Sequence, residues 1–156
     1  MILVVGLGNP GKEYEKTRHN AGRIILEHIA HANDFSEWKN DMKTKSLRAK
    51  GEVNGVKMEF MLPETFMNNS GNAVVPVIDS VKKLKNLVVV YDDIDIPIET
   101  MKISFNRSAG GHNGLASIIK RVKSEAFVRI RIGVSPHTPT GKIKKPKGEE
   151  AVLKFL

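Results

Sequence analysis

Leu87-Val-Val-Val-Tyr91, followed by Asp92-Asp-Ile-Asp95, is the stretch that decides how the chain folds. A continuous apolar run predicts a strand that is buried on both faces, which is typical of the centre of a parallel sheet. Ile2 to Val5, which ends at Gly6, has the same character and predicts a second buried strand. Predicted strands and helices alternate along the chain, and this order predicts an α/β fold.

Periodicity and turn chemistry predict the other elements. Ala21 to Ala32 has apolar residues at helical spacing, with Asn20 as its expected N-cap. Asn54-Gly55 takes the positive φ angles of a tight turn, so a β-hairpin is expected around it. Further helices are expected at 70–83, capped by Ser70 or Asn68 and kinked by Pro76, and at 114–123, and further strands at 47–53, 56–62, 102–105 and 128–134.

Composition limits the class of protein. The chain has 156 residues and no cysteine, which excludes disulfides, cysteine-based zinc sites and thiol nucleophiles. It has no run of about 18 apolar residues and no basic leader before the first strand. We therefore expect one soluble, cytoplasmic domain over residues 1–156, with a Pro-, Gly-, Thr- and Lys-rich mobile basic loop at 135–148.

Positive charge is concentrated in the second part of the chain. Residues 1–100 hold 13 Lys and Arg against 14 Asp and Glu, whereas residues 101–156 hold 12 against 3. Such a concentration suits a polyanionic partner, because each phosphate that a cation neutralises releases counterions. A solvated basic surface is the alternative.

Gly6-Leu-Gly-Asn-Pro-Gly11 matches the G-x-G-x-x-G pattern of dinucleotide-binding loops. In that motif the third glycine lies at the start of the helix that receives the pyrophosphate. Here Pro10 and a polar stretch separate the loop from the helix near Asn20, and the next strands form a hairpin. The context therefore argues against a bound nucleotide.

Several polar residues stand at predicted strand ends or helix starts: Asn9, His19, Asn68, Asp92 and Asn113. Loops after parallel strands converge at one edge of a sheet, so these side chains are expected in one pocket. One imidazole, a carboxylate and amides suffice to activate water and hold a carbonyl oxygen. Simpler readings remain: Asn68 as a helix cap, His19 as a surface residue, and the acidic run as a strand exit or a divalent-cation site.

Three glycines surround His112 and Asn113 in Gly110-Gly-His-Asn-Gly114. They suggest close approach of the backbone to a ligand at a helix N-terminus, with a flexible turn as the alternative.

Five blocks, in this order, resemble those of the bacterial peptidyl-tRNA hydrolase family: Val5-Gly-Leu-Gly-Asn-Pro-Gly11, Thr17-Arg-His-Asn-Ala-Gly22, Leu62-Pro-Glu-Thr-Phe-Met-Asn68, Tyr91-Asp-Asp-Ile-Asp-Ile-Pro97 and Ser108-Ala-Gly-Gly-His-Asn-Gly114. The resemblance implies a single α/β domain with a mixed central sheet flanked by helices, of the phosphorylase/hydrolase-like type. It also implies a monomer that cleaves the ester between a peptide and the 3′ ribose of tRNA without metal or cofactor.

The same resemblance assigns roles to residues. His19 is expected as the catalytic base and Asp92 as the carboxylate that orients it. The residues expected to bind the peptide and the ester are Asn9, Tyr14, Met67, Asn68 and Asn113. Those expected to contact the tRNA backbone are Lys102, Arg107, Arg131 and Lys142.

The sequence also departs from the family pattern. Family members usually continue beyond residues 152–155 through a final helix, so that helix is expected to be short or missing. Arg107 stands where glycine is common, and Arg23 replaces a usually apolar residue. These departures leave an alternative open, a diverged or truncated paralogue that binds RNA without hydrolysing it.

We predict that NAD and FAD do not bind specifically, because the glycine-rich loop lacks the helix start that would hold a pyrophosphate. Titration of the purified protein with either nucleotide should give no saturable signal. Saturation at a micromolar dissociation constant would contradict this prediction.

Overall fold

The computed structural model describes residues 1–147, 152 and 154–156, which form one α/β domain around a mixed sheet. Its strands are β1 (Ile2–Gly6), β2 (Lys39–Asp41), β3 (Ser46–Val53), β4 (Val56–Pro63), β5 (Leu87–Pro97), β6 (Met101–Phe105) and β7 (Val128–Ser135), in the spatial order β2-β3-β4-β1-β5-β7-β6. The helices are α1 (Ala21–Ala32), α2 (Ser70–Val74), α3 (Val81–Lys85) and α4 (Asn113–Val122), with short 3-10 turns η1 (Arg18–Asn20), η2 (Met67–Asn69) and η3 (Val75–Val77).

β5 lies at the centre of the sheet, as its apolar sequence predicted. It pairs in parallel with β1 on one side and with β7 on the other. Leu87 and Val89 have no exposed surface and Val90 has almost none. Asp92 follows this buried run within β5, next to the carboxyl end of β1, and ligands bind at such strand ends in open α/β folds.

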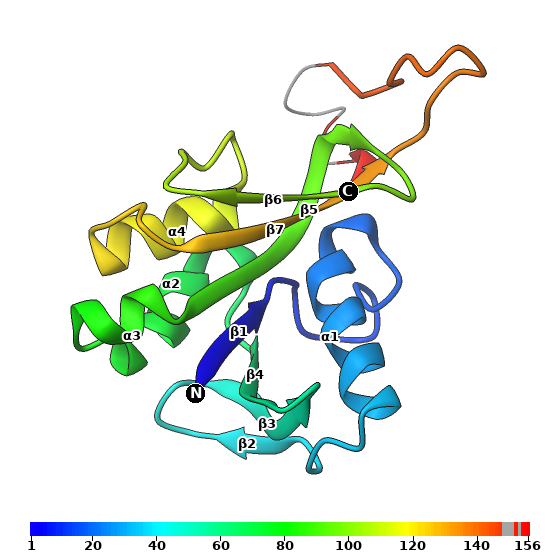
Figure 1. Cartoon of the computed structure of the whole chain (residues 1–156). Helices are drawn as coiled ribbons and strands as arrows, with labels where there is room; N and C mark the ends of the chain where they lie inside the picture. The colour runs from blue at the N-terminus through cyan, green and yellow to red at the C-terminus, as the bar shows by residue number, and fades with distance from the viewer. Residues whose placement is uncertain (148–151, 153) are drawn as a thin grey trace.

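Helices cover both faces of the sheet (Figure 1). On one face, α1 packs through Leu26 and Ala30 against Val4, Phe60 and Val90. On the other face, α4 packs with residues of α2, β1 and β5, in a cluster that includes Val5, Val74, Val89, Leu115 and Ile118. The site described below lies between these two layers.

The hairpin around Asn54-Gly55 is confirmed. Asn54 has φ 49° and Gly55 has φ 81°, the positive values that a tight turn between β3 and β4 requires. β2, which pairs with β3, was not expected, because Lys39-Asn-Asp41 carries no apolar pattern. Trp38, just before β2, packs at the edge of the core beneath α1.

The single helix expected at 70–83 is wrong. α2 ends at Val74, η3 follows, and a separate helix, α3, begins after Ser80, whose hydroxyl accepts the Lys83 N–H. Pro76 explains the break, because it has no N–H to continue the helical hydrogen bonds. Ser70 is also not a cap: its hydroxyl donates to the Met67 carbonyl, 2.8 Å away.

Asn20 occupies the N-cap position of α1, but its side chain makes no capping hydrogen bond. Its amide instead bonds the backbone of Asn9. The expected cap is therefore a tertiary contact.

Beyond β7, residues 136–147 are largely irregular, with one bridge between His137 and Ile143. The mobility expected for 135–148 stays a prediction. Towards the end of the chain, where the final helix is expected to be short or missing, residues 148–151 and 153 lie outside the described residues, and Val152, Lys154 and Phe155 are helical. Among the described residues, no helix is long and apolar enough to cross a membrane.

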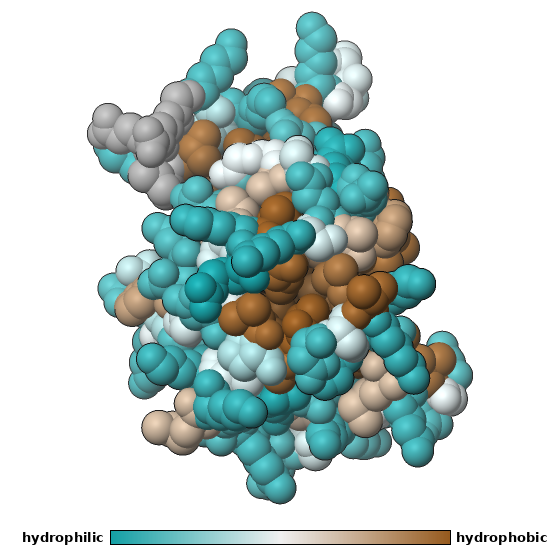
Figure 2. Space-filling model, turned by 90° about the vertical axis from the view of Figure 1, so that its left-hand side faces the viewer, coloured by the Kyte–Doolittle hydropathy of each residue, from teal (hydrophilic) through white to brown (hydrophobic). Residues whose placement is uncertain are grey.

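β6 forms an edge of the sheet and exposes Met101, Ile103 and Phe105, each by more than half. Figure 2 views the side of the molecule on which α3 and α4 lie in Figure 1, and hydrophobic side chains gather near the middle of this face among polar ones. The surface of the basic second part of the chain is therefore partly apolar.

We predict that Gly22→Ala lowers the free energy of unfolding by about 1–3 kcal/mol, the usual range for overpacking, despite a gain in helix propensity of up to about 1 kcal/mol. A Cβ at this position would overlap the Val90 carbonyl oxygen and lie 2.9 Å from the Leu7 nitrogen. Urea denaturation measures the change. His28→Ala, on the exposed face of α1, is the matched control. An unchanged midpoint for Gly22→Ala would contradict the close packing of α1 on the sheet.

Candidate active site

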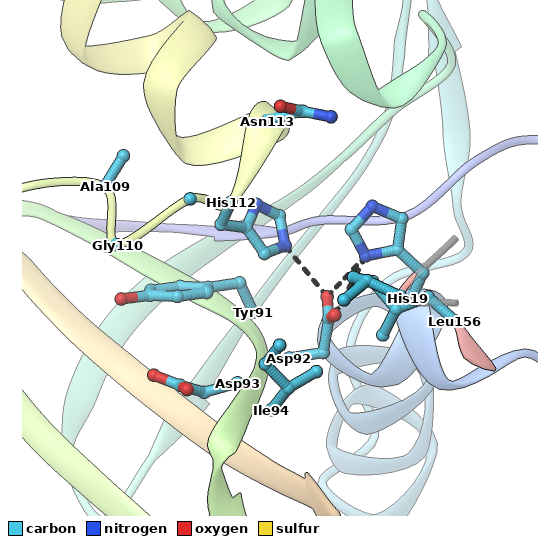
Figure 3. A pocket seen from close by; sticks show the side chains of 12 residues that line it. His19, Tyr91, Asp92, Asp93, Ile94, Ala109, Gly110, His112, Asn113 and Leu156 are labelled. Carbon is cyan, nitrogen blue, oxygen red and sulfur yellow. Dashed lines mark hydrogen bonds and ion pairs between the residues drawn. The ribbon is translucent and has the colours of Figure 1, made fainter. Parts of the chain in front are cut away.

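Two histidines share the carboxylate of Asp92 in the middle of β5 (Figure 3). His19 Nδ1 lies 2.9 Å from both Asp92 oxygens, and His112 Nε2 lies 2.8 Å from Oδ1. The two imidazole rings are 4.8 Å apart between centroids. η1 supplies His19, and the residue before α4 is His112, so the carboxylate joins the two helical layers.

The hydrogen bonds fix the protons on both rings. The Leu115 N–H donates to His112 Nδ1 at 3.2 Å, so this nitrogen carries a lone pair, and Nε2 carries the proton that it donates to Asp92. His19 Nδ1 likewise faces an oxygen that only accepts. His19 Nε2 is then the unprotonated nitrogen of a neutral ring and is free to accept a proton.

Asp92 is ionised in this arrangement. Burial raises the pKa of its carboxyl, but the charge and hydrogen bond of His112, followed by those of His19, outweigh burial and lower the pKa to about 2. At neutral pH the group is therefore a carboxylate, which accepts from both imidazoles and favours a positive charge on either of them.

His19, Asp92 and His112 place potential metal ligands within 4.8 Å of one another. Their chemistry does not suit a metal. His112 Nδ1 already accepts the Leu115 N–H, so a metal on Nε2 would require a ring that has lost both protons. The three side chains fit a hydrogen-bonded set better than a metal centre.

A cavity of about 390 Å³ opens over these groups. Its wall includes His19, Asp92, His112 and Asn113, together with Val152 and Leu156 from the end of the chain.

The turn before α4 shapes another part of this wall. Gly110 and Gly111 have φ 60° and 85°, so this turn needs glycine at both positions. Arg129, fully buried, donates to the Ser108 carbonyl at 3.0 Å and holds the start of the loop.

Asn9 lies on the neighbouring loop after β1. Its side-chain Oδ1 accepts the Met67 N–H at 2.7 Å, so its Nδ2 remains as a donor. Met67 is buried and its sulfur lies against Gly114 at the start of α4. Asn9 is thereby connected to the same helix start that carries His112 and Asn113.

The structure brings part of the expected site residues together, whereas Asn9 lines a separate hollow with Gly11, Asn20 and Arg23. His19, Asp92 and Asn113 line one cavity, and Asn9 contacts Met67. Asn68 is exposed on η2, directly after Met67, and Tyr14 meets the exposed Phe66 edge to face, with ring centroids 6.4 Å apart.

Sequence reasoning missed the bond between His112 and Asp92. The glycines around His112 marked the segment, but nothing local indicated which side chain it would meet.

The residues expected at the tRNA backbone differ in their surroundings. Lys102, Arg107 and Lys142 are exposed. Arg131 is buried, with its Nε 2.8 Å from Asp93 and its Nη1 3.3 Å from the Ser104 hydroxyl. The charge of Arg131 is already paired with Asp93, and its contact with tRNA stays a prediction.

Comparisons with known proteins agree with this geometry. Residues 3–154 match the family described as Peptidyl-tRNA hydrolase. The peptidyl-tRNA hydrolase of Pediococcus pentosaceus is 42% identical over 139 residues, which are 88% of this chain and 74% of that protein. The one from Carboxydothermus hydrogenoformans is 44% identical over 135 residues, with shares of 86% and 71%.

Solved structures give the same answer. The crystal structure of peptidyl-tRNA hydrolase from Acinetobacter baumannii superposes with a TM-score of 0.85 at 33% identity, over 99% of this chain and 74% of that one. Since the family match extends over nearly the whole sequence and the relatives exceed 40% identity, the chain belongs to the peptidyl-tRNA hydrolase family.

Proposed function

We propose that this protein hydrolyses the ester bond between the peptide and the 3′ ribose of tRNA in peptidyl-tRNA, which returns the tRNA for reuse. Family membership supports the substrate. The observation that carries the chemistry is the orientation of His19, whose Nδ1 faces Asp92 while its Nε2 is free to accept a proton. A water molecule needs such a base to attack an ester at neutral pH.

His19 acts as the general base in this proposal. Its Nε2 removes a proton from water as the water oxygen attacks the ester carbonyl, and the imidazolium that forms is stabilised by the Asp92 carboxylate at 2.9 Å. The proton then passes to the departing 3′ oxygen of the ribose. A positioned base of this kind contributes about 10² to 10⁴ in rate.

Asn9 holds the negative charge that develops on the carbonyl oxygen. Its Oδ1 is occupied by the Met67 N–H, so the amide presents Nδ2 as the donor. Asn68, exposed one residue after Met67, is the second donor. Asn113, Met67 and Tyr14 complete the surface that binds the ester and the peptide.

His112 keeps Asp92 in place. Its Nε2–H occupies Oδ1 at 2.8 Å, so the carboxylate cannot rotate away from His19 without breaking that bond. His112 is itself fixed by the Leu115 N–H.

Lys102, Arg107 and Lys142 contact the phosphates of the tRNA backbone. All three are exposed, and none has to leave a buried ion pair to do so. The protein is further proposed to work as a cytoplasmic monomer without a nucleotide cofactor.

Incubation of purified protein with diacetyl-lysyl-tRNA, with released tRNA as the readout, tests the function. Multiple turnovers support hydrolysis. Tight binding without turnover would identify an RNA-binding paralogue instead.

We predict that His19→Ala lowers kcat by at least about two orders of magnitude while tRNA binding persists, because the base is removed and the phosphate contacts remain. Asp92→Asn should also act mainly on kcat, since a neutral amide no longer stabilises the imidazolium. Steady-state kinetics and filter binding measure the two effects. The control is His28→Ala, on the exposed face of α1, which should hydrolyse at the wild-type rate. Near wild-type turnover by His19→Ala would make the assignment of the base wrong.

We predict that the exchange of Lys142, Lys144, Lys145 and Lys147 for alanine flattens the dependence of RNA affinity on salt, because each lost phosphate contact removes about 0.7 to 0.9 from the slope. Cleavage of a short ester substrate should not change. Lys43, Lys57, Lys82 and Lys85 are exposed, and their exchange for alanine removes the same charge elsewhere. An equal slope in both variants would mean that the loop lysines do not contact RNA.

A further inference from the structure

We propose that Asn20 is a positioning residue for hydrolysis, which holds Asn9 so that the Asn9 Nδ2 stays directed at the ester carbonyl. This inference rests on the proposed function, in which Asn9 donates to the carbonyl oxygen. It assigns to Asn20 a role through Asn9, without contact to the substrate.

Both polar atoms of the Asn20 side chain bond the backbone of Asn9. The Asn9 N–H donates to Asn20 Oδ1 at 2.8 Å, and Asn20 Nδ2 donates to the Asn9 carbonyl at 2.9 Å. Asn20 is 1% exposed, so water does not compete for these bonds. Two bonds in opposite directions fix both the position and the rotation of the Asn9 backbone.

The start of α1 has no side-chain cap, because the amide of Asn20 bonds Asn9 instead. Asn20 stands at the N-cap of α1 and makes no capping bond from its side chain. The Leu7 carbonyl instead accepts the Arg23 N–H at 3.2 Å, which satisfies one donor of the first turn. The loop after β1 and the start of α1 are thus joined by reciprocal bonds.

Gly8 makes the approach possible. A Cβ on Gly8 would lie 2.9 Å from Asn20 Cγ and 3.0 Å from Asn20 Oδ1. The loop therefore has room for the amide only while position 8 lacks a side chain. This packing explains the glycine at position 8 without a bound nucleotide.

The same turn carries the base. His19 and Asn20 are consecutive residues of η1, so the residue that removes the proton and the one that fixes the oxyanion donor move together. Asn9 is held at its other end by Met67 N–H, 2.7 Å from Oδ1. The distance between base and donor is then set by one short turn, and a displacement of about 1 Å can cost about 10²-fold in rate.

A double-mutant cycle in kcat for peptidyl-tRNA tests the proposal. Asn9→Ala should lose about 10² to 10³, the usual loss for one oxyanion donor. Asn20→Ala should lose at least about tenfold with KM changed little, because misplacement of a transition-state donor acts on kcat. The double variant should be no slower than Asn9→Ala, because Asn20 has nothing left to position.

Asn20→Asp separates bonding from shape. It keeps the volume and the acceptor for the Asn9 N–H but places an oxygen against the Asn9 carbonyl, so its kcat should fall like that of Asn20→Ala. Hydrogen exchange should accelerate at the Asn9 and Met67 amides and stay slow in β5. Asn33→Ala is the control, since Asn33 follows the last residue of the same helix and its side chain donates to the Ile29 carbonyl.

Two results would overturn the proposal in a wild-type protein that hydrolyses its substrate. One is a double variant whose loss is the product of the single losses, which means that Asn20 acts independently of Asn9. The other is wild-type kcat in Asn9→Ala or in Asn20→Asp. Absence of turnover in the wild-type protein would instead contradict the proposed function, so the two failures are distinguishable.

Discussion

The burial of one carboxylate, Asp92, constrains the rest of the site. The group is 2% exposed and ionised, and a buried charge is tolerated only where hydrogen bonds replace its water. The bonds come from His19, which precedes α1, and from His112, which precedes α4. Because α1 and α4 lie on opposite faces of the sheet, both helix starts must meet at Asp92, in the middle of β5. The need to satisfy Asp92 therefore couples the active-site geometry to the packing of the two layers.

Glycines allow the elements around Asp92 to pack this closely. Gly22 brings α1 against the Val90 carbonyl, Gly71 brings α2 against the Ser117 carbonyl of α4, and Gly8 admits the side chain of Asn20. Each is a place where a Cβ would collide with its neighbour. The functional side chains project from loops. The helices and strands that bear those loops pack backbone against backbone at Gly22 and Gly71, and this packing leaves no room for adjustment. This rigidity suits a reaction that depends on the relative placement of a base and an oxyanion donor.

Local signals in the sequence predicted most of the fold but only part of the site. The apolar run of β5 and the turn at Asn54-Gly55 are determined by residues within each segment, and both were predicted. Pro76 was expected to kink one helix. The chain instead ends that helix and begins a new one after Ser80, whose hydroxyl accepts the Lys83 N–H. β2 and the bond between His112 and Asp92 escaped prediction because both exist only through pairing with distant residues. His19 was placed beside Asp92 through the resemblance of motifs, not through periodicity or spacing.

The acidic run after Tyr91 would repel a polyanion if its charges were free. Each carboxylate has its own partner: Asp92 the two imidazoles, Asp93 the guanidinium of Arg131 at 2.8 Å, and Asp95 the ammonium of Lys145 at 2.5 Å. Arg131 and Lys145 belong to the basic second part of the chain, so part of that excess charge neutralises the strand exit. The pairing also weighs against a divalent-cation site, because a cation there would have to displace Arg131 or Lys145. A negatively charged RNA can therefore approach His19 without opposing an uncompensated carboxylate of this run.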